Sequence, residues 1–318
     1  MLFTLLACNP DVDLSEQPEA GEPVDVTVSD ADLGELTENQ IVLTGADIVL
    51  EPGTDTMICY YGTYTGPDVG LHDVHTFQGK FGHHFTFNGT TTPAIDVPDG
   101  TVVDCTSESD QFQMSSLEPI GLPNVNTVNG ETTVAMPLPE GMAVELESGQ
   151  RYILQSHYLN SSPDPIRVTD KVVLTTLPVD EVETWAAPLI FNRGDFVIPP
   201  GESYSTSFSC TTEEDVNLLY SLGHMHEWGT SFRVDQIEGE ERIPFYSLPE
   251  WDPVYRDAPM IESSVEDPKF IPAGTTFETT CEWFNDTDHE LVFPHEMCVN
   301  VNFVYPQKAT IICDGEGQ

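Results

Sequence analysis

The chain has 318 residues, enough for about two domains that each bury a core of their own. Its 54 acidic and 10 basic residues give a net charge of −44, which argues against binding to the phosphate backbone of nucleic acids. Solubility in a saline habitat, a solvated face, an acidic tether and steering of cations are all consistent with this charge. The 25 prolines and 23 glycines favour short strands and turns.

The N-terminal segment, residues 1–8, is apolar and too short to span a bilayer. Its last four residues, Leu5-Leu6-Ala7-Cys8, resemble the lipobox of a bacterial lipoprotein, which predicts lipidation at Cys8, although the usual preceding basic region is missing. An ordinary buried cysteine is the alternative. Residues 9–34 are rich in Asp, Glu, Pro and Ser, as linkers are. We therefore expect an extracytoplasmic protein, either lipid-anchored at a bacterial membrane surface or secreted.

Short apolar segments with strand character, separated by Gly, Pro, Asn and Asp, follow from Glu35 onward. They lie at 41–43, 48–50, 57–61, 85–87, 101–103, 152–154 and 171–174, and after a break around 178–183 at 196–198, 204–210, 216–226, 231–234, 276–283 and 297–305. No long amphipathic helix is predicted. The sequence thus predicts an all-β protein with a signal remnant and linker at 1–34 and two tandem antiparallel β-sandwich domains, at 35–180 and 181–318.

One predicted strand ends with His224 and His226, two residues apart. Because side chains of a strand alternate between faces, both imidazoles point to the same side, which is half of a transition-metal site. Met297 opens the last predicted strand and offers a thioether, a soft ligand that favours Cu(I). If Met297 completes the site, the metal is copper.

His83 and His84 are adjacent, so on a regular strand they point to opposite faces. Both reach one metal only where the backbone is irregular, and Gly82 favours a bulge or turn there. The alternative places one histidine inside and one outside. His157 is a third candidate ligand, and the three imidazoles together would suit a redox copper.

The other four histidines are predicted not to bind metal. His72 and His75 lie in a polar, loop-like stretch, and His289 lies in a turn. His295 is only two residues from Met297, so the alternative is that it approaches the metal. The chain has no Gly-x-Ser-x-Gly elbow, His-Glu-x-x-His motif, P-loop, dinucleotide-binding glycine motif or Cys-x-x-Cys pair, which removes the usual hydrolase, nucleotide and thiol-redox interpretations.

Five short motifs, taken in order, resemble the type II copper, ascorbate-dependent monooxygenases, the family of peptidylglycine α-hydroxylating monooxygenase and dopamine β-hydroxylase. The motifs are His83-His84, Gln155-x-His157, Ile198-Pro199-Pro200-Gly201-Glu202, His224-x-His226 and Glu296-Met297-Cys298. The resemblance covers roughly residues 35–313. It implies two tandem jelly-roll-like β-sandwiches, each with one copper, that face each other across a solvent-filled cleft.

By this resemblance, His83, His84 and His157 would hold an electron-transfer copper, and His224, His226 and Met297 a copper that binds O2 and substrate. The implied activity is hydroxylation of a C–H bond with O2 and ascorbate or another one-electron reductant. The alternatives are a copper-binding or electron-transfer protein without hydroxylase activity, and a structural lipoprotein in which the histidines are relics.

Six cysteines remain when Cys8 is set aside, an even number that is compatible with three disulfides in an oxidising compartment. The sequence alone leaves every pairing open. The resemblance implies that Cys59 pairs with Cys105, Cys210 with Cys313, and Cys281 with Cys298.

Two residues depart from the peptide-hydroxylating members of the family. Leu222 stands where those members have an arginine that binds the substrate carboxylate, and Val301 stands where they have a tyrosine. A peptidylglycine carboxylate would lack its charged partner here, so the sequence favours another small-molecule or peptide-like substrate.

Overall fold

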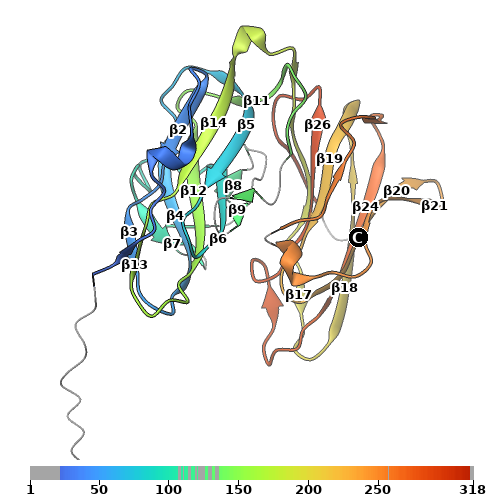
Figure 1. Cartoon of the computed structure of the whole chain (residues 1–318). Helices are drawn as coiled ribbons and strands as arrows, with labels where there is room; N and C mark the ends of the chain where they lie inside the picture. The colour runs from blue at the N-terminus through green and yellow to red at the C-terminus, as the bar shows by residue number, and fades with distance from the viewer. Residues whose placement is uncertain are drawn as a thin grey trace, which may run out of the picture.

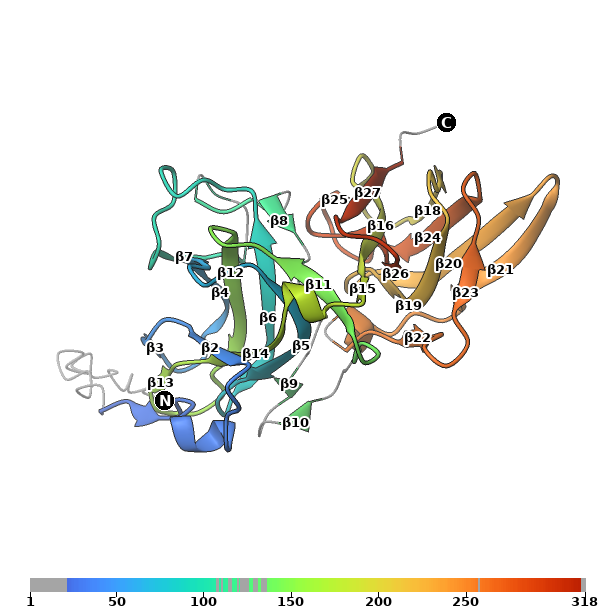
Figure 2. The ribbon, with the colours of Figure 1, turned by 90° about the horizontal axis from the view of Figure 1, so that it is seen from above.

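The computed structural model describes residues 22–106, 136–256 and 258–315, and between 107 and 135 only residues 109, 111–113, 116–118, 120, 126–127 and 131–132. Cys8 and its predicted lipobox lie outside the described residues. Two β-sandwiches lie side by side, as Figure 1 and the view from above in Figure 2 show. Every strand pairing that the structure describes falls within β1–β15, here called the first sandwich, or within β16–β27, the second sandwich. The expected all-β fold is confirmed.

The first sandwich has two five-stranded sheets, ordered β15-β11-β5-β14-β2 and β7-β4-β12-β6-β8. Their strands are β2 (Gln40–Thr44), β4 (Asp55–Thr63), β5 (Val69–Phe77), β6 (Gly82–Thr90), β7 (Val102–Asp104), β8 (Leu117–Glu118), β11 (Met142–Leu146), β12 (Arg151–Leu159), β14 (Lys171–Pro178) and β15 (Thr184–Trp185). A small sheet adds β1 (Val24–Asp25), β13 (Ile166–Val168) and β3 (Ile48–Leu50), and β9 (Asn126–Thr127) pairs with β10 (Glu131–Thr132).

The second sandwich has sheets ordered β22-β19-β26-β16-β27 and β18-β24-β20-β21; β23 also pairs with β19, and β17 pairs with β25. Its strands are β16 (Ala187–Arg193), β17 (Val197–Ile198), β18 (Ser203–Thr211), β19 (Val216–His224), β20 (Gly229–Glu238), β21 (Glu241–Leu248), β22 (Ile261–Ser263), β23 (Lys269–Ile271), β24 (Thr276–Phe284), β25 (Leu291–Val292), β26 (Cys298–Tyr305) and β27 (Ile311–Asp314).

Four strands of each sheet follow the same order in both sandwiches. The order β2-β14-β5-β11 in the first corresponds to β16-β26-β19-β23 in the second, and β4-β12-β6-β8 corresponds to β18-β24-β20-β21. In both cases the chain crosses repeatedly between the two sheets, which is the winding of a jelly roll. The expected jelly-roll-like sandwiches are therefore present.

Helical turns are short in the part of the chain that the structure describes. They are the 3-10 turns η1 (Asp30–Leu33), η3 (Val179–Glu181) and η4 (Pro253–Arg256). None of the described helical segments has the length and apolar character needed to cross a bilayer.

An apolar cluster joins the two sandwiches. It contains Phe87, Leu138 and Tyr152 of the first sandwich together with Tyr220 and Leu222 of the second. The Tyr220 hydroxyl also donates a hydrogen bond to the carbonyl of Pro137. Burial of this shared apolar surface fixes how the two sandwiches face each other.

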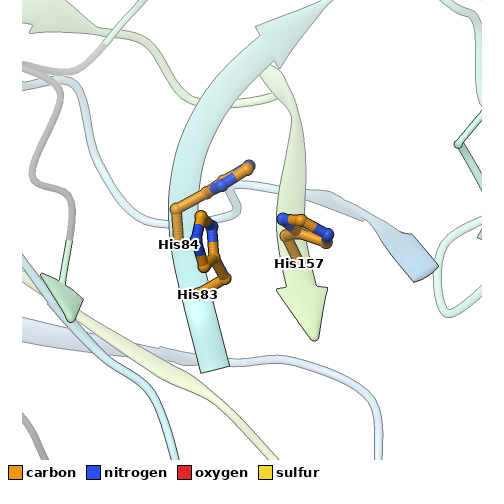
Figure 3. A group of neighbouring side chains, drawn as sticks. All are labelled: His83, His84 and His157. Atoms are coloured by element: carbon orange, nitrogen blue, oxygen red, sulfur yellow. The ribbon is translucent and has the colours of Figure 1, made fainter. Parts of the chain in front are cut away.

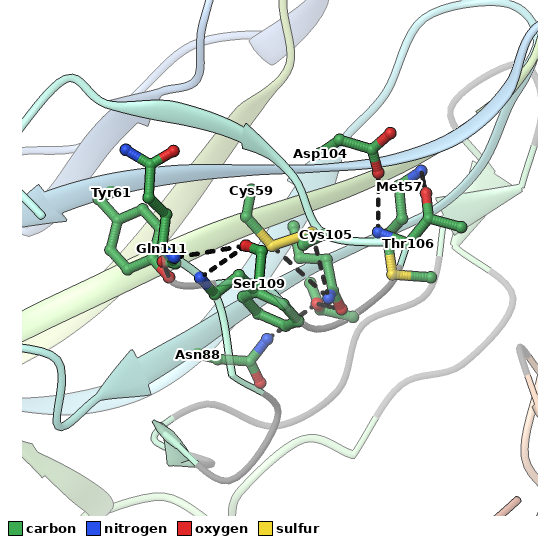
Figure 4. Close-up of a disulfide and its surroundings, with 12 residues drawn as sticks. Met57, Cys59, Tyr61, Asn88, Asp104, Cys105, Thr106, Ser109 and Gln111 are labelled. Carbon is green, nitrogen blue, oxygen red and sulfur yellow. Dashed lines mark hydrogen bonds between the residues drawn. A yellow bond between two sulfur atoms is a disulfide. The ribbon is translucent and has the colours of Figure 1, made fainter. Parts of the chain in front are cut away.

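Three disulfides link the strands, and their pairing is the one that the family resemblance implied. The pairs are Cys59–Cys105, Cys210–Cys313 and Cys281–Cys298. In Figure 4 the first of these joins β4 to the segment that follows β7. Three disulfides indicate an oxidising, extracytoplasmic environment.

Two sequence expectations differ from the structure. The predicted linker is shorter than residues 9–34, because Val24 and Asp25 pair with β13 and Val28 is buried. The stretch around His72 and His75, predicted to be a loop, is the nine-residue strand β5. Its pairing with β14 shifts at His72, so the alternation that marks a strand is interrupted there.

Asp170 is a buried acid in the first sandwich whose carboxylate accepts hydrogen bonds from the hydroxyls of Ser156 and Tyr158 and from the backbone N–H of Gly79. Burial raises the pKa of Asp170 from 3.8 to about 6, although these hydrogen bonds act in the opposite direction. The folded state therefore holds the proton more tightly than the unfolded state. Protonated Asp170 therefore contributes to the unfolding free energy below about pH 4, and this contribution is lost as the pH rises through about 6.

We predict that Asp170→Asn removes this pH dependence. Relative to wild type, the variant should gain up to about 3 kcal/mol in unfolding free energy between about pH 4 and pH 7.5, because wild type must hold a buried charge at the higher pH. Urea denaturation at both pH values measures the difference. Asp164→Asn, at an exposed position, controls for the loss of one charge. An Asp170→Asn effect of equal size at both pH values would contradict this prediction.

Candidate metal centre

Three histidines of the first sandwich, here called the first cluster, converge from two neighbouring strands. His84 on β6 pairs directly with His157 on β12, and the next pairing is Gly82 with Tyr158, so His83 is left as the extra residue of a bulge. The bulge brings His83 to the same side as its neighbour, and Figure 3 shows the three imidazoles turned toward one another. Their ligand nitrogens lie within 4.8 Å of one another. The irregular backbone predicted at Gly82 is confirmed.

Hydrogen bonds hold His157 in place on both its backbone and its ring. Gln78 donates from Nε2 to the carbonyl oxygens of His84 and His157, at 3.0 and 3.1 Å. The Nε2 atom of His157 lies 2.8 Å from Oδ1 of Asp55. The Nδ1 atom of His157 is buried, and no described group makes a hydrogen bond to it. A buried nitrogen lone pair without a donor, beside two other imidazoles, fits a metal ligand.

The second cluster is formed by His224 and His226 with Met297. Met225 between the histidines points into the core and is fully buried, so both imidazoles lie on the opposite side, as the spacing predicted. Their Nε2 atoms are 3.1 Å apart. The Nδ1 atom of His226 lies 3.1 Å from the carbonyl oxygen of His295. A carbonyl only accepts, so Nδ1 carries the proton and Nε2 presents its lone pair.

Met297 lies at the start of the strand that neighbours the two histidines. His224 pairs with Val299 on β26, and Met297 directly precedes Cys298, the first residue of that strand. Met297 is largely buried and lines the same cleft as both histidines. The second cluster therefore combines two imidazoles and a thioether on adjacent strand ends.

A buried carboxylate connects the segments that carry the second cluster through hydrogen bonds. Glu296 is fully buried and accepts hydrogen bonds from the backbone N–H groups of His226, Trp228 and Met297 and from Nε1 of Trp283, at 2.8 to 3.2 Å. Burial raises the pKa of Glu296, and the four donors offset part of that rise. Glu296 thus ties the segment of His226 to the segment of Met297.

One cleft of about 1060 Å³ lies between the sandwiches, and both clusters line it. His84 and His157 contribute from the first sandwich, and His224, His226 and Met297 from the second. Much of the remaining wall is apolar, formed by Phe87, Leu117, Leu222, Phe293, Val301 and Phe303.

Leu222 and Val301, the two positions that depart from the peptide-hydroxylating enzymes, pair across β19 and β26 and lie together in this wall. A charged side chain is nevertheless present nearby, because Arg256 also lines the cleft, where it forms an ion pair with Glu227.

The other histidines take different places. His295 is exposed and lines the cleft, contributing its carbonyl to His226. His289 is exposed and hydrogen-bonded to Asp288, as predicted for a turn. His72 uses Nδ1 to contact the carbonyl of Met142. Sequence reasoning did not find the roles of Asp55, Gln78 and Glu296, because each acts through a contact between distant segments.

Comparisons with known proteins do not assign a family. No family model matches the chain, and no curated protein matches it. Among solved structures, the STIV MCP crystal structure is similar with a TM-score of 0.30 and 9% identity, over 83% of this chain and 96% of that chain. The VP2 subviral particle of infectious bursal disease virus gives a TM-score of 0.19 and 12% identity, over 90% and 74% of the two chains.

We predict that Glu296→Ala destabilises the second sandwich by about 3 kcal/mol or more, because it leaves several buried N–H donors without an acceptor. Glu296→Gln, which keeps one acceptor oxygen, should cost less. Denaturant unfolding measures both changes. The matched control is Glu290→Ala at a nearby exposed position, with an expected change within about 0.5 kcal/mol. Equal effects of Glu296→Ala and Glu290→Ala would show that the buried carboxylate does not fasten these segments.

Proposed function

We propose that this protein is a copper-dependent monooxygenase that hydroxylates a C–H bond with O2 and a one-electron reductant such as ascorbate. The observation that carries the proposal is that an all-nitrogen cluster and a cluster with a thioether line one cleft from different sandwiches. The overall reaction converts R–H, O2, two electrons and two protons into R–OH and water. Bound copper would supply the one-electron redox chemistry and the activation of O2.

The ligand sets suit two different tasks. His83, His84 and His157 would hold the electron-transfer copper, because three neutral imidazoles remain suitable ligands in both oxidation states. His224, His226 and Met297 would hold the copper at which O2 and substrate meet, because a thioether favours Cu(I) and three protein ligands leave a position open. The proton on Nδ1 of His226 leaves the lone pair of that ring on Nε2, the atom that faces Nε2 of His224.

The cleft wall favours a substrate that presents an uncharged carbon to the second cluster. Leu222 and Val301 offer apolar contact next to His224 and provide no partner for a carboxylate. Burial of a substrate carboxylate against them would carry a desolvation cost. Arg256 is engaged with Glu227, so we propose an amine or a neutral small-molecule or peptide-like substrate rather than a peptidylglycine.

Copper loading and Met297→Ala test this function. After copper reconstitution, wild type should bind two copper ions per chain and consume O2 in the presence of ascorbate and a productive substrate. Met297→Ala should lower hydroxylation by about 100-fold or more while the electron paramagnetic resonance signal of the first cluster remains. Oxygen uptake and product mass measure the rate, and Met260→Ala, at an exposed methionine, is the control.

Three outcomes would contradict the proposal. Well under one copper per folded chain would remove the metal function. Loss of both coppers in Met297→Ala would refute the division of roles between the clusters. Copper binding without any hydroxylated product, across a panel of amines and peptides, would favour a copper-binding or electron-transfer protein instead.

We also propose that Cys8 is lipidated and that the acidic segment after it holds the sandwiches away from a membrane. The apolar residues before Cys8 and the disulfides, which indicate an extracytoplasmic location, support this proposal. Expressed with its full N-terminus in a bacterial host, wild type should partition into the detergent phase, and Cys8→Ser should move to the aqueous phase. Wild type in the aqueous phase would contradict the lipid anchor.

A further inference from the structure

Asp55 is a polar residue that contacts a ring of the first cluster and that the proposed function leaves without a role. It begins β4, the strand that pairs with β12 on the side away from β6, and its register partner is Leu159. Its side chain reaches diagonally to His157, where Oδ1 lies 2.8 Å from Nε2. The carboxylate side chain is 66% exposed and the imidazole only 13%, so Asp55 touches the cluster from the solvent side.

The contact determines which nitrogen of His157 carries the proton. An ionised carboxylate accepts hydrogen bonds and has no proton to donate, so Nε2 is the nitrogen that carries the proton in this contact. The lone pair of the neutral ring is then on Nδ1. This atom is buried without a hydrogen bond from any described group, and His157 lies in the group of three histidines whose ligand nitrogens are within 4.8 Å.

We infer that Asp55 is the positioning residue of the first cluster, which orients the His157 ring and fixes the tautomer whose Nδ1 binds the metal. A carboxylate behind a metal-bound imidazole also makes that imidazole a more basic ligand. Its negative charge favours the more highly charged metal ion, so Asp55 should stabilise Cu(II) relative to Cu(I) at this cluster. The statement about the metal rests on the proposed function, whereas the statement about the tautomer does not.

The tautomer is tested first on the metal-free full chain. Two-bond 15N–1H correlation spectra of protein labelled with 15N-histidine distinguish Nδ1–H from Nε2–H, and the His157 signals are assigned by their loss in His157→Gln. Wild type should show His157 with its proton on Nε2. In Asp55→Ala the ring should become a mixture of tautomers or switch, and Asp55→Asn, which keeps an acceptor oxygen, should retain the wild-type form. Wild-type tautomer in Asp55→Ala would overturn the inference.

Copper binding is tested second, in a His226→Ala background so that the first cluster is loaded alone, with circular dichroism to verify folding. Asp55→Ala should weaken copper affinity by about 10- to 100-fold in a chelator competition. Asp55→Asn should weaken Cu(II) binding more than Cu(I) binding, because it removes the charge and keeps the hydrogen bond. Pulsed electron paramagnetic resonance should show a changed remote-nitrogen signal for one imidazole in Asp55→Ala.

The control is Asp47→Ala, which removes an exposed aspartate of the same sandwich that contacts Arg167 rather than a histidine. Asp47→Ala should leave copper affinity, the remote-nitrogen signal and the His157 tautomer unchanged. Equal affinities in Asp55→Ala and Asp47→Ala would overturn the positioning role toward the metal. Failure of the wild-type cluster to bind copper would instead refute the proposed function, and the spectra of the metal-free chain would still decide the role of Asp55 in fixing the ring.

Discussion

Neighbouring side chains of a β-strand point to opposite faces. The geometry of both clusters depends on whether their strands keep this alternation. The second cluster follows it, because His224 and His226 are two residues apart and Met225 between them enters the core. The first cluster breaks it, because the bulge at His83 turns that ring to the side of His84. A regular strand at this position would leave only two of the three imidazoles together.

Buried carboxylates accept hydrogen bonds from the segments that carry both clusters and so hold these segments in place. Glu296 connects the segments of His226 and Met297 through their own backbone N–H groups. Asp170 accepts from Ser156 and Tyr158, the two residues that flank His157. Burial raises the pKa of both acids, and the hydrogen bonds from these donors offset only part of that rise. Each acid therefore retains part of the cost of its burial while its hydrogen bonds hold the segments that carry the histidines in place.

The sequence predicted the features that local periodicity encodes and missed those that depend on distant pairing. Most strands, the side shared by His224 and His226, and the bulge near Gly82 all follow from short patterns. The strand β5 was missed because a shift in pairing at His72 interrupts its alternation. The contact of Asp55 with His157 could not be predicted, because it depends on the register of β4 against β12. The common strand order of the sandwiches leaves no visible sequence repeat, since many different sequences with the same alternation of apolar and polar residues can form a given strand.

The clusters occupy non-equivalent places in the two jelly rolls, and this difference is what brings them to one cleft. The first cluster lies on β6 and β12, whereas the second lies at the ends of β19 and β26, which correspond to β5 and β14 of the first sandwich. On β19, Tyr220 and Leu222 pack against the first sandwich, and His224 continues the same face. The apolar contact that joins the sandwiches therefore also sets where the second cluster faces the first. Had the second cluster instead occupied β20 and β24, the equivalents of β6 and β12, the face of β19 that packs against the first sandwich would carry no candidate ligand.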